Sequence, residues 1–175
     1  RDDELSFEDR WILSRLAATA EQVTTDLEER YGFSSCANAL YTFVWRQFCD
    51  WYVELSKSRL EAGGRPRQVV QKVLAFVLDL ILRLLHPVIC FETEELWSRL
   101  NEIIPDRSLN ERLVAPPSEV LILAAWPELP TGLRDPAVEA AMATRQDVIR
   151  AIRDIRARMG ISPRKKLSAL VNVPD

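Results

Sequence analysis

The sequence predicts a mainly α fold, an antiparallel bundle of helices followed by a small C-terminal α/β appendage. Apolar residues recur at steps of three and four through residues 12–103, which is the period of helices that bury one face. Beyond Pro105 this pattern gives way to short β-like runs separated by prolines. We therefore expect a helical bundle over residues 1–105, an irregular connection with one short strand over 106–135, and a C-terminal helix plus strand over 136–175.

The composition fits one main domain in a reducing compartment. The chain has 175 residues, of which 47% are apolar and 28% charged, enough to bury a sizeable core. Its three cysteines show no paired short spacing, which argues against a disulfide framework or a zinc site. The most apolar stretch, residues 69–85, is interrupted by charged side chains and is expected to be a buried helix. We expect a cytoplasmic protein, and because the chain starts without methionine we expect it to be a piece of a larger one.

The first helix is predicted from its start signal. Ser6 and Asp9 have the spacing of a reciprocal capping pair, and apolar residues follow at helical steps as far as Leu27. The helix is expected to end near Tyr31 and Gly32. Such a short connection to the next helix makes the two antiparallel neighbours.

The long central helix, residues 35–61, carries most of the large aromatic side chains. Ser34 or Ser35 is expected to cap its start, and the Gly63-Gly64 pair to end it. We expect Trp45, Phe48 and Trp51 to lie mainly in the interior, with one or two aromatics at the edge available for stacking. Its apolar stripe comprises Leu40, Tyr41, Val44, Phe48, Trp51, Tyr52 and Leu55.

Two further helices complete the predicted bundle. Pro66 stands in the first turn of the third helix, where its missing amide does no harm, and His86-Pro87 ends that helix. Thr93 is expected to cap a fourth helix, which stops before Pro105.

The C-terminal third combines two β-like runs with one more helix. The runs cover Val120 to Ala124 and Leu167 to Val173, and we predict a strand at each. Asp135 and Pro136 form a good helix start, and the helix that follows is expected to end at Gly160.

The sequence carries no recognisable catalytic chemistry. It has no glycine-rich phosphate loop, no nucleophile elbow and no histidine or cysteine cluster. Its single histidine, His86, lies between a leucine-rich helix and a proline and is expected to be structural. The neighbouring carboxylates Glu94 and Glu95 are interpreted as partners of a helix dipole. We therefore expect no catalytic residue, no metal and no cofactor in this part of the protein.

The basic charge is concentrated near the C-terminus. Residues 145–166 contain eight basic and two acidic side chains, whereas residues 1–30 contain nine acidic and four basic ones. Such a cluster suits a phosphate backbone. The alternative is a solvated helix face that forms salt bridges with Asp147 and Asp154, and charge alone does not separate the two.

Three segments resemble the anticodon-binding region of class I aminoacyl-tRNA synthetases. They are Phe43 to Leu55 (FVWRQFCDWYVEL), His86 to Trp97 (HPVICFETEELW) and Ala125-Trp126-Pro127. The segments Asp9 to Leu16, Ile152 to Ala157 and Ile161-Ser162-Pro163 are most similar to the valine members, while the His86 segment is shared with the leucine and isoleucine members. Cys90 departs from the family by standing where a proline is usual, and Arg164 by standing where a small residue is common.

The resemblance implies a helical anticodon-binding domain that positions tRNA(Val) for aminoacylation. The ATP, the valine and the acceptor end would then meet on other domains, the catalytic and editing domains of the same parent chain. Single-stranded loops are recognised by stacking on aromatic or guanidinium planes, and phosphates by cations. Candidate RNA-binding residues are therefore Arg10, Trp11, Arg15 and Arg46, with Arg153, Arg156, Lys165 and Lys166 for phosphates.

Two alternatives remain open at this point. One is an anticodon-binding module of a leucine or isoleucine relative. The other is a helical protein-interaction module without an RNA partner, which the acidic pI of about 5.4 favours and the basic cluster disfavours. An independent enzyme is a third reading, and it lacks a reactive group.

Overall fold

Helix α1, Phe7–Glu28, begins with the predicted capping pair. The structure, a computed structural model, describes residues 4–162, 165–166 and 168. The amide of Asp9 donates to Ser6 Oγ over 3.2 Å, and the amide of Ser6 donates to Asp9 Oδ2 over 2.9 Å. The predicted helical steps are confirmed, because Ile12, Leu16 and Val23 are all fully buried.

The central helix is one continuous run of three segments. These are α2 (Phe33–Tyr41), the π-helical η2 (Thr42–Val53) and α3 (Glu54–Ala62), so the predicted helix is confirmed with slightly wider bounds. The predicted serine cap is wrong, because the capping position is Gly32 and no side chain bonds the first amides. The predicted end is confirmed: Gly63 takes a φ of 73°, which a residue without Cβ adopts most easily.

The π winding decides which aromatics of this helix are buried. Its i→i+5 hydrogen bonds lengthen the turn, so the buried series runs Phe43, Phe48, Tyr52 in steps of five and four. The interior position predicted for Trp45 is wrong for this reason, since 56% of the residue is exposed. Phe48 is buried and stacks on Tyr52 with ring centroids 6.1 Å apart, while Trp51 is only half-buried.

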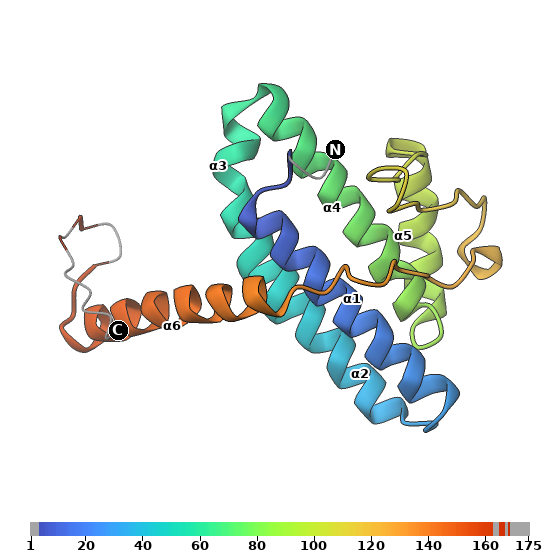
Figure 1. Cartoon of the computed structure of the whole chain (residues 1–175), viewed down its shortest axis with the longest axis horizontal. Coiled ribbons are helices and arrows are strands. Elements are labelled where there is room, and N and C mark those ends of the chain that lie inside the picture. The colour runs from blue at the N-terminus through green and yellow to red at the C-terminus, as the bar shows by residue number, and fades with distance from the viewer. Residues whose placement is uncertain (1–3, 163–164, 167, 169–175) are drawn as a thin grey trace. The chain divides into compact units, whose positions relative to one another are not determined.

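Helix α4, Gly64–Leu85, has eleven buried residues, as many as α1, and α5, Cys90–Ile103, packs beside it (Figure 1). Pro66 lies in the first turn of α4 as predicted. The predicted cap at Thr93 is wrong, because α5 starts at Cys90 and Thr93 lies within its first turn. There the hydroxyl of Thr93 donates to the carbonyl of Ile89 over 2.9 Å.

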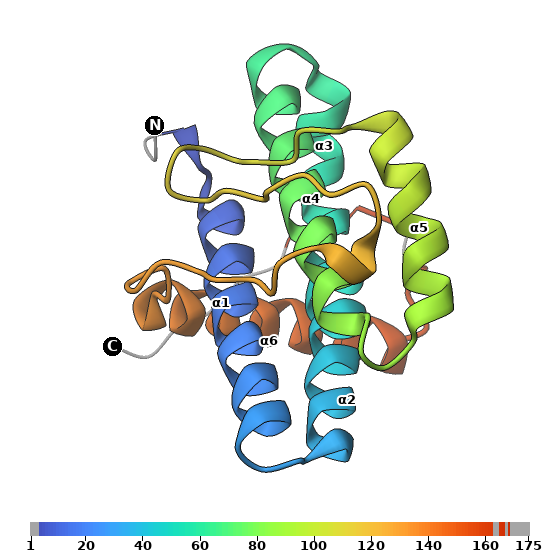
Figure 2. The ribbon, with the colours of Figure 1, turned by 90° about the vertical axis from the view of Figure 1, so that its right-hand side faces the viewer.

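The connection between α5 and α6 is held by side chains of the helices. Figure 2 shows it crossing the face of α4 toward α1. The strand predicted at Val120 to Ala124 is wrong, because a short 3₁₀ turn, η3 (Leu121–Leu123), occupies this position. Instead of a neighbouring strand, the Glu94 carboxylate accepts the amides of Leu121 and Ile122, over 2.8 and 3.2 Å.

A buried ion cluster joins α4 to this connection. Asp79 Oδ1 accepts from Arg83 Nε over 2.6 Å, and Asp79 Oδ2 accepts from Arg107 Nε over 2.7 Å. The two guanidinium groups lie 4.9 and 4.2 Å from the ring centroid of Trp97. Arg83 also donates to the carbonyls of Ala125 and Pro116, and the Trp97 indole donates to that of Ser118. These donors fix an irregular backbone that has no ladder of its own.

The chain forms two compact units, Arg1–Asp135 and Pro136–Asp175. Within the second, α6 (Pro136–Arg158) ends in a Schellman turn, with the amide of Ile161 donating to the carbonyl of Arg156 over 2.9 Å. No strand forms among the described residues, and the strand predicted at Leu167 to Val173 lies almost entirely outside them. The prediction of a mainly α fold is confirmed.

Candidate nucleic-acid interface

A buried network fixes the π segment against the start of α1. Asp9 Oδ1 accepts from the Tyr52 hydroxyl over 2.7 Å, and both carboxylate oxygens of Asp9 accept from Arg59, over 2.7 and 2.8 Å. Burial alone raises the pKa of Asp9, but the hydrogen bonds from Arg59, Tyr52 and Ser6 outweigh it, so the net pKa is lowered. Burial, together with the Asp9 charge, raises the pKa of Tyr52, which therefore stays a hydrogen-bond donor.

The outer face of α2 and η2 presents exposed aromatic side chains beside a cation. Phe33, Tyr41 and Trp45 are separated by multiples of four residues, and each is more than half exposed. Arg46, adjacent to Trp45 in the chain, is also exposed and makes no hydrogen bond or ion pair with the described residues. Exposed ring faces next to a guanidinium provide the contacts on which unpaired bases stack.

A polar groove of about 660 Å³ runs between α1 and the α2–η2 helix. Within it Arg15 Nε donates to Gln47 Oε1 over 3.1 Å, which sets the orientation of both side chains. The single carboxylate on its wall, Glu21, lies 3.4 Å from Arg134. Most of the lining is donors and acceptors suited to base edges: Arg15, Arg30, Arg134, Gln22, Asn38, Gln47, Thr19, Thr25, Ser35 and Thr42.

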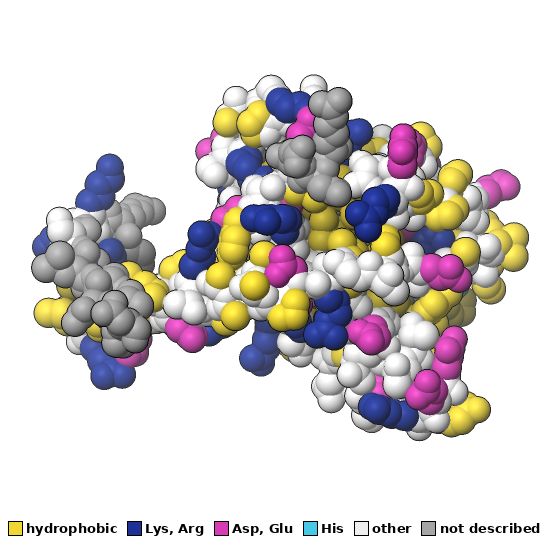
Figure 3. Space-filling view, in the orientation of Figure 1, with side chains coloured by type: hydrophobic (Ala, Val, Ile, Leu, Met, Phe, Trp, Pro, Cys, Tyr) yellow, Lys and Arg dark blue, Asp and Glu magenta, His cyan; other side chains and the backbone are white. Residues whose placement is uncertain are grey.

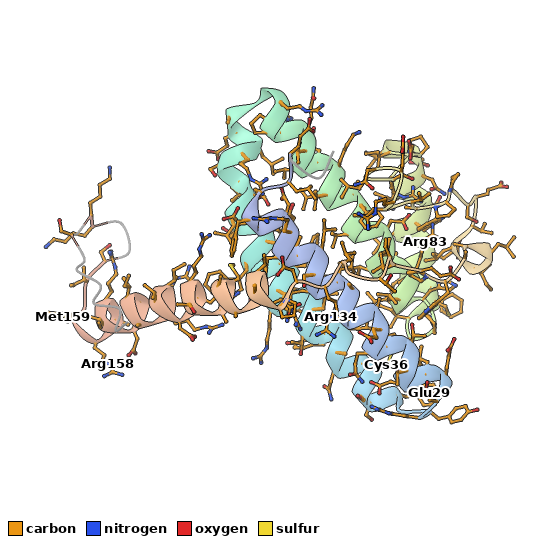
Figure 4. All side chains as sticks on the ribbon, viewed as in Figure 1. Glu29, Cys36, Arg83, Arg134, Arg158 and Met159 are labelled. Carbon is orange, nitrogen blue, oxygen red and sulfur yellow. The ribbon has the colours of Figure 1, made fainter. Side chains whose placement is uncertain are left out.

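The groove extends to the turn between α1 and α2, where Arg30 and Ser35 line it. Figure 4 labels Glu29 and Cys36 at this end of the two helices and Arg83 on α4, away from it. Asp26 is buried at this end, and Arg30 Nη1 approaches its Oδ1 to 3.5 Å. Hydrogen bonding from Ser35 and Gln22, with the Arg30 charge, lowers the pKa of Asp26 against the effect of burial. The carboxylate therefore stays ionised beneath the groove and holds Arg30 beside it.

The structure separates the four candidate residues of the first unit. Arg15 lines the groove, and Arg46 lies next to the groove residue Gln47. Arg10 is exposed but faces a different, smaller hollow of about 190 Å³ beside Arg112. Trp11 is in the core with 3% exposure, so it offers no ring face to a base. Its residue type made Trp11 a stacking candidate, but it lies on the buried face of α1.

The cations of the second unit have distinct local roles. Arg150 pairs with Asp147 over 2.7 Å and Arg158 with Asp154 over 2.6 Å, so the salt-bridged interpretation holds for these two. Arg156 donates to the carbonyls of Ser162 and Lys165 and thereby stabilises the turn that follows α6. The remaining candidates, Arg153, Lys165 and Lys166, are exposed.

Several residues of this surface could not be predicted from the sequence. Arg134 reaches the groove from the connection, more than a hundred residues beyond Arg15, and no local pattern indicates that approach. Asn38 lines the groove from α2, and Tyr41, which was expected in the apolar stripe, is 57% exposed. Arg30 was the most accessible to prediction, since its spacing of four from Asp26 is the helical ion-pair spacing.

Among the described residues, no group of three or more histidine, cysteine or acidic side chains is arranged to hold a metal. Within the same part of the chain, every helix is too short or too polar to traverse a bilayer.

Known proteins resemble this chain over most of its length. Residues 9–171 match the family described as the anticodon-binding domain of tRNA ligase. The chain is 40% identical to the valine–tRNA ligase of Rhodopirellula baltica over 170 residues, 95% of this chain and 16% of the relative. It is 39% identical to that of Streptomyces avermitilis over 99% of this chain and 18% of the relative, and 40% identical to that of Neisseria meningitidis serogroup B over 97% and 17%.

The chain thus spans about a sixth of the length of these curated relatives. The family match, in contrast, extends over nearly all of the chain and includes both compact units. The chain therefore belongs to the family of anticodon-binding domains of tRNA ligases.

Proposed function

We propose that this chain binds the anticodon stem and loop of tRNA(Val) as part of a valine–tRNA ligase. The observation that carries the proposal is the pairing of exposed aromatic rings with a polar groove on one helix of a family member. Trp45 and Tyr41 stack loop bases, Arg46 holds a phosphate or a base edge, and the groove reads base edges through Arg15 and its neighbours. ATP and valine are used on other domains of the parent, in the cytoplasm, and this part needs no cofactor.

The phosphate contacts belong to the second unit in this proposal. Lys165, Lys166 and Arg153 attract the backbone of the stem, while Arg156 keeps the lysine-bearing turn in place. The fold that we propose with this function has an antiparallel order of the helices, which short turns favour, and a C-terminal α/β appendage. Two relatives of similar chemistry, the leucine and isoleucine enzymes, stay as the alternative parents.

Fluorescence anisotropy with labelled hairpins tests the base contacts. Base–aromatic stacking is worth roughly 1–3 kcal/mol per base, so Trp45→Ala should weaken binding of the valine anticodon hairpin by about five-fold to more than a hundred-fold. The starting affinity of this part alone is expected at about 10⁻⁴ to 10⁻⁶ M. Phe91→Ala removes a ring on α5 that is even more exposed, 86% against 56%, and should leave binding unchanged.

A parallel pair of variants tests the cation. Arg46→Ala should weaken hairpin binding, whereas Arg67→Ala removes another exposed arginine and should not. If both aromatic variants, or both arginine variants, bind like wild type, the outer face of α2 and η2 is not the RNA surface. A chain that binds no hairpin at high micromolar concentration would favour the protein-interaction alternative.

A further inference from the structure

An exposed apolar patch lies outside the proposed RNA surface. It consists of Val88, Ile89, Phe91, Ile122 and Leu123, which are between 41% and 86% exposed. We call it the α5–η3 patch. In Figure 3 hydrophobic side chains gather at the right-hand edge of the first unit, over η3, with acidic side chains near them.

Hydrogen bonds bring the two parts of the patch together. Glu94 lies one turn after Phe91 on α5, and its carboxylate accepts the amides of Leu121 and Ile122. Leu121 is buried against Leu82 and Trp97, which anchors η3 from below. Ile122 and Leu123 therefore project outward beside the first turn of α5.

The exposed side chains are also held out by the backbone beneath them. Thr93 Oγ1 lies 2.8 Å from His86 Nδ1 and donates to the carbonyls of Ile89 and Cys90. Leu85 accepts the amides of Val88 and Ile89, over 2.9 and 3.0 Å. These bonds hold the turn in place with its apolar side chains exposed, and an exposed apolar patch with a polar edge is typical of an interaction surface.

The edge of the patch indicates the chemistry of its occupant. Glu92, Glu95 and Glu119 are exposed around it, and the nearest cation on α5, Arg99, is paired with Glu95 over 2.7 Å. Carboxylates repel a phosphate backbone, so RNA does not suit this face. A complementary surface has apolar side chains at its centre and lysine or arginine around them.

The length of the relatives indicates where that surface lies. This chain spans only 16–18% of them, so most of such a polypeptide lies outside this domain. A covalently attached surface is present at an effective concentration of about a millimolar, and interfaces between domains of one chain are commonly small. A patch of a few side chains meets that requirement more easily than the roughly 800 Å² per partner of a stable complex between separate proteins.

We propose that the α5–η3 patch docks onto another domain of the same polypeptide, through an apolar surface ringed by lysine or arginine. The inference rests on the proposed function in one respect, that this domain is carried by a longer tRNA ligase. It concerns a different surface from the groove, so each can be tested without the other.

Cys90 provides a native probe, because it is exposed between Ile89 and Phe91. Cys36 is fully buried and serves as the internal control, and burial raises the pKa of the Cys49 thiol, which slows its reaction. Maleimide labelling of Cys90, followed by peptide mass spectrometry, is measured in this chain and in the full-length polypeptide without RNA. We expect labelling in the full-length polypeptide to be about ten-fold slower or more, since a docked fraction of nine-tenths leaves about a tenth of the thiol accessible.

Matched variants in the full-length polypeptide locate the contact. Phe91→Asp should restore fast labelling of Cys90, while Ile103→Asp, which charges an equally exposed position at the far end of α5, should not. Circular dichroism of both variants checks that they fold. Equal labelling rates in the short and full-length wild-type chains would overturn the proposal.

Two other results would identify a different occupant and also overturn the proposal. Protection of Cys90 that grows with the concentration of the short chain indicates a second copy. Protection of the short chain by a hairpin indicates RNA. The two proposals fail separately. Unchanged hairpin binding by Trp45→Ala contradicts the RNA surface only, and equal Cys90 labelling in the short and full-length chains contradicts the docking surface only.

Discussion

The Asp79 cluster permits a sharp stability prediction. Asp79→Asn keeps the shape of the side chain but removes the one carboxylate that two buried guanidinium groups share. Removing one partner from a buried ion pair typically costs about 3–5 kcal/mol. The upper part of this range applies, because the introduced amide also turns an N–H₂ donor toward an arginine donor that now sits within 2.7 Å. That loss is a large share of the roughly 5–15 kcal/mol that holds a domain folded.

Urea unfolding followed by circular dichroism and tryptophan fluorescence measures the effect. With a slope of about 2 kcal/mol per molar urea, the midpoint should fall by roughly 2 M. Glu54→Gln is the matched control, because it breaks an ion pair with Lys57 whose side chains are both 57% exposed, and it should change stability by less than about 1 kcal/mol. Arg107→Met should cost less than Asp79→Asn, since the pair of Asp79 with Arg83 survives it. An Asp79→Asn variant that unfolds within about 1 kcal/mol of wild type would refute the assignment of a shared buried carboxylate.

Three further outcomes follow from the structure. The pKa of Asp9 in the folded protein lies below its ordinary value, so the carboxylate contributes stability that is complete above about pH 5 and is lost as pH falls through the folded pKa. Asp9→Asn should therefore flatten the dependence of the urea midpoint on pH between about 5 and 2. An unchanged slope in the variant would contradict this prediction. Trp97→Ala, in the core, should cost about 3–5 kcal/mol of unfolding free energy, whereas Trp45→Ala should cost little, and equal losses in urea unfolding would place Trp45 inside. The double variant Lys165→Glu, Lys166→Glu should weaken the binding of all hairpins alike and reduce the slope of log affinity against log salt by about 2 or more. A change in selectivity between hairpins would instead indicate that these lysines contact bases.

The sequence predicts helix starts and ends correctly where they depend only on neighbouring residues. The capping pair Ser6 and Asp9 and the glycine end at Gly63 are found as predicted, because each depends on neighbours within a few residues. Thr93 has the right side chain for a cap but lies inside a helix, since the turn after Leu85 starts α5 earlier. The β-like run around Leu121 has no strand to pair with among the described residues, and the connection follows the hydrogen-bond donors of α4 and α5.

The candidate site was predictable only in part, for related reasons. Arg15 and Arg46 were proposed because a guanidinium can stack on a base, and the fold brings them to the two helices beside the groove. Residue type alone does not tell which side chains face solvent, so the same reasoning offered Trp11, which is buried. Trp45 was expected inside because burying a large side chain is favourable, and nothing in the residue pattern indicates the change to π winding. Arg134 depends on tertiary structure alone.

The path of the connection between α5 and α6 is determined in part by side chains of the helices α4 and α5. Arg83, Trp97 and Asn101 all donate to its backbone carbonyls, at Ala125, Pro116, Ser118 and Glu119. A carbonyl is the same in every amino acid, and proline retains it while lacking the N–H. These particular contacts therefore do not depend on the side chains at the four positions, and Pro116 loses nothing by being a proline. Leu121 and Trp126, in contrast, are held by their side chains. Residues 114–126 moved to another scaffold should lose their shape, while a different segment of equal length that keeps Leu121 and Trp126 should take the same path between these helices.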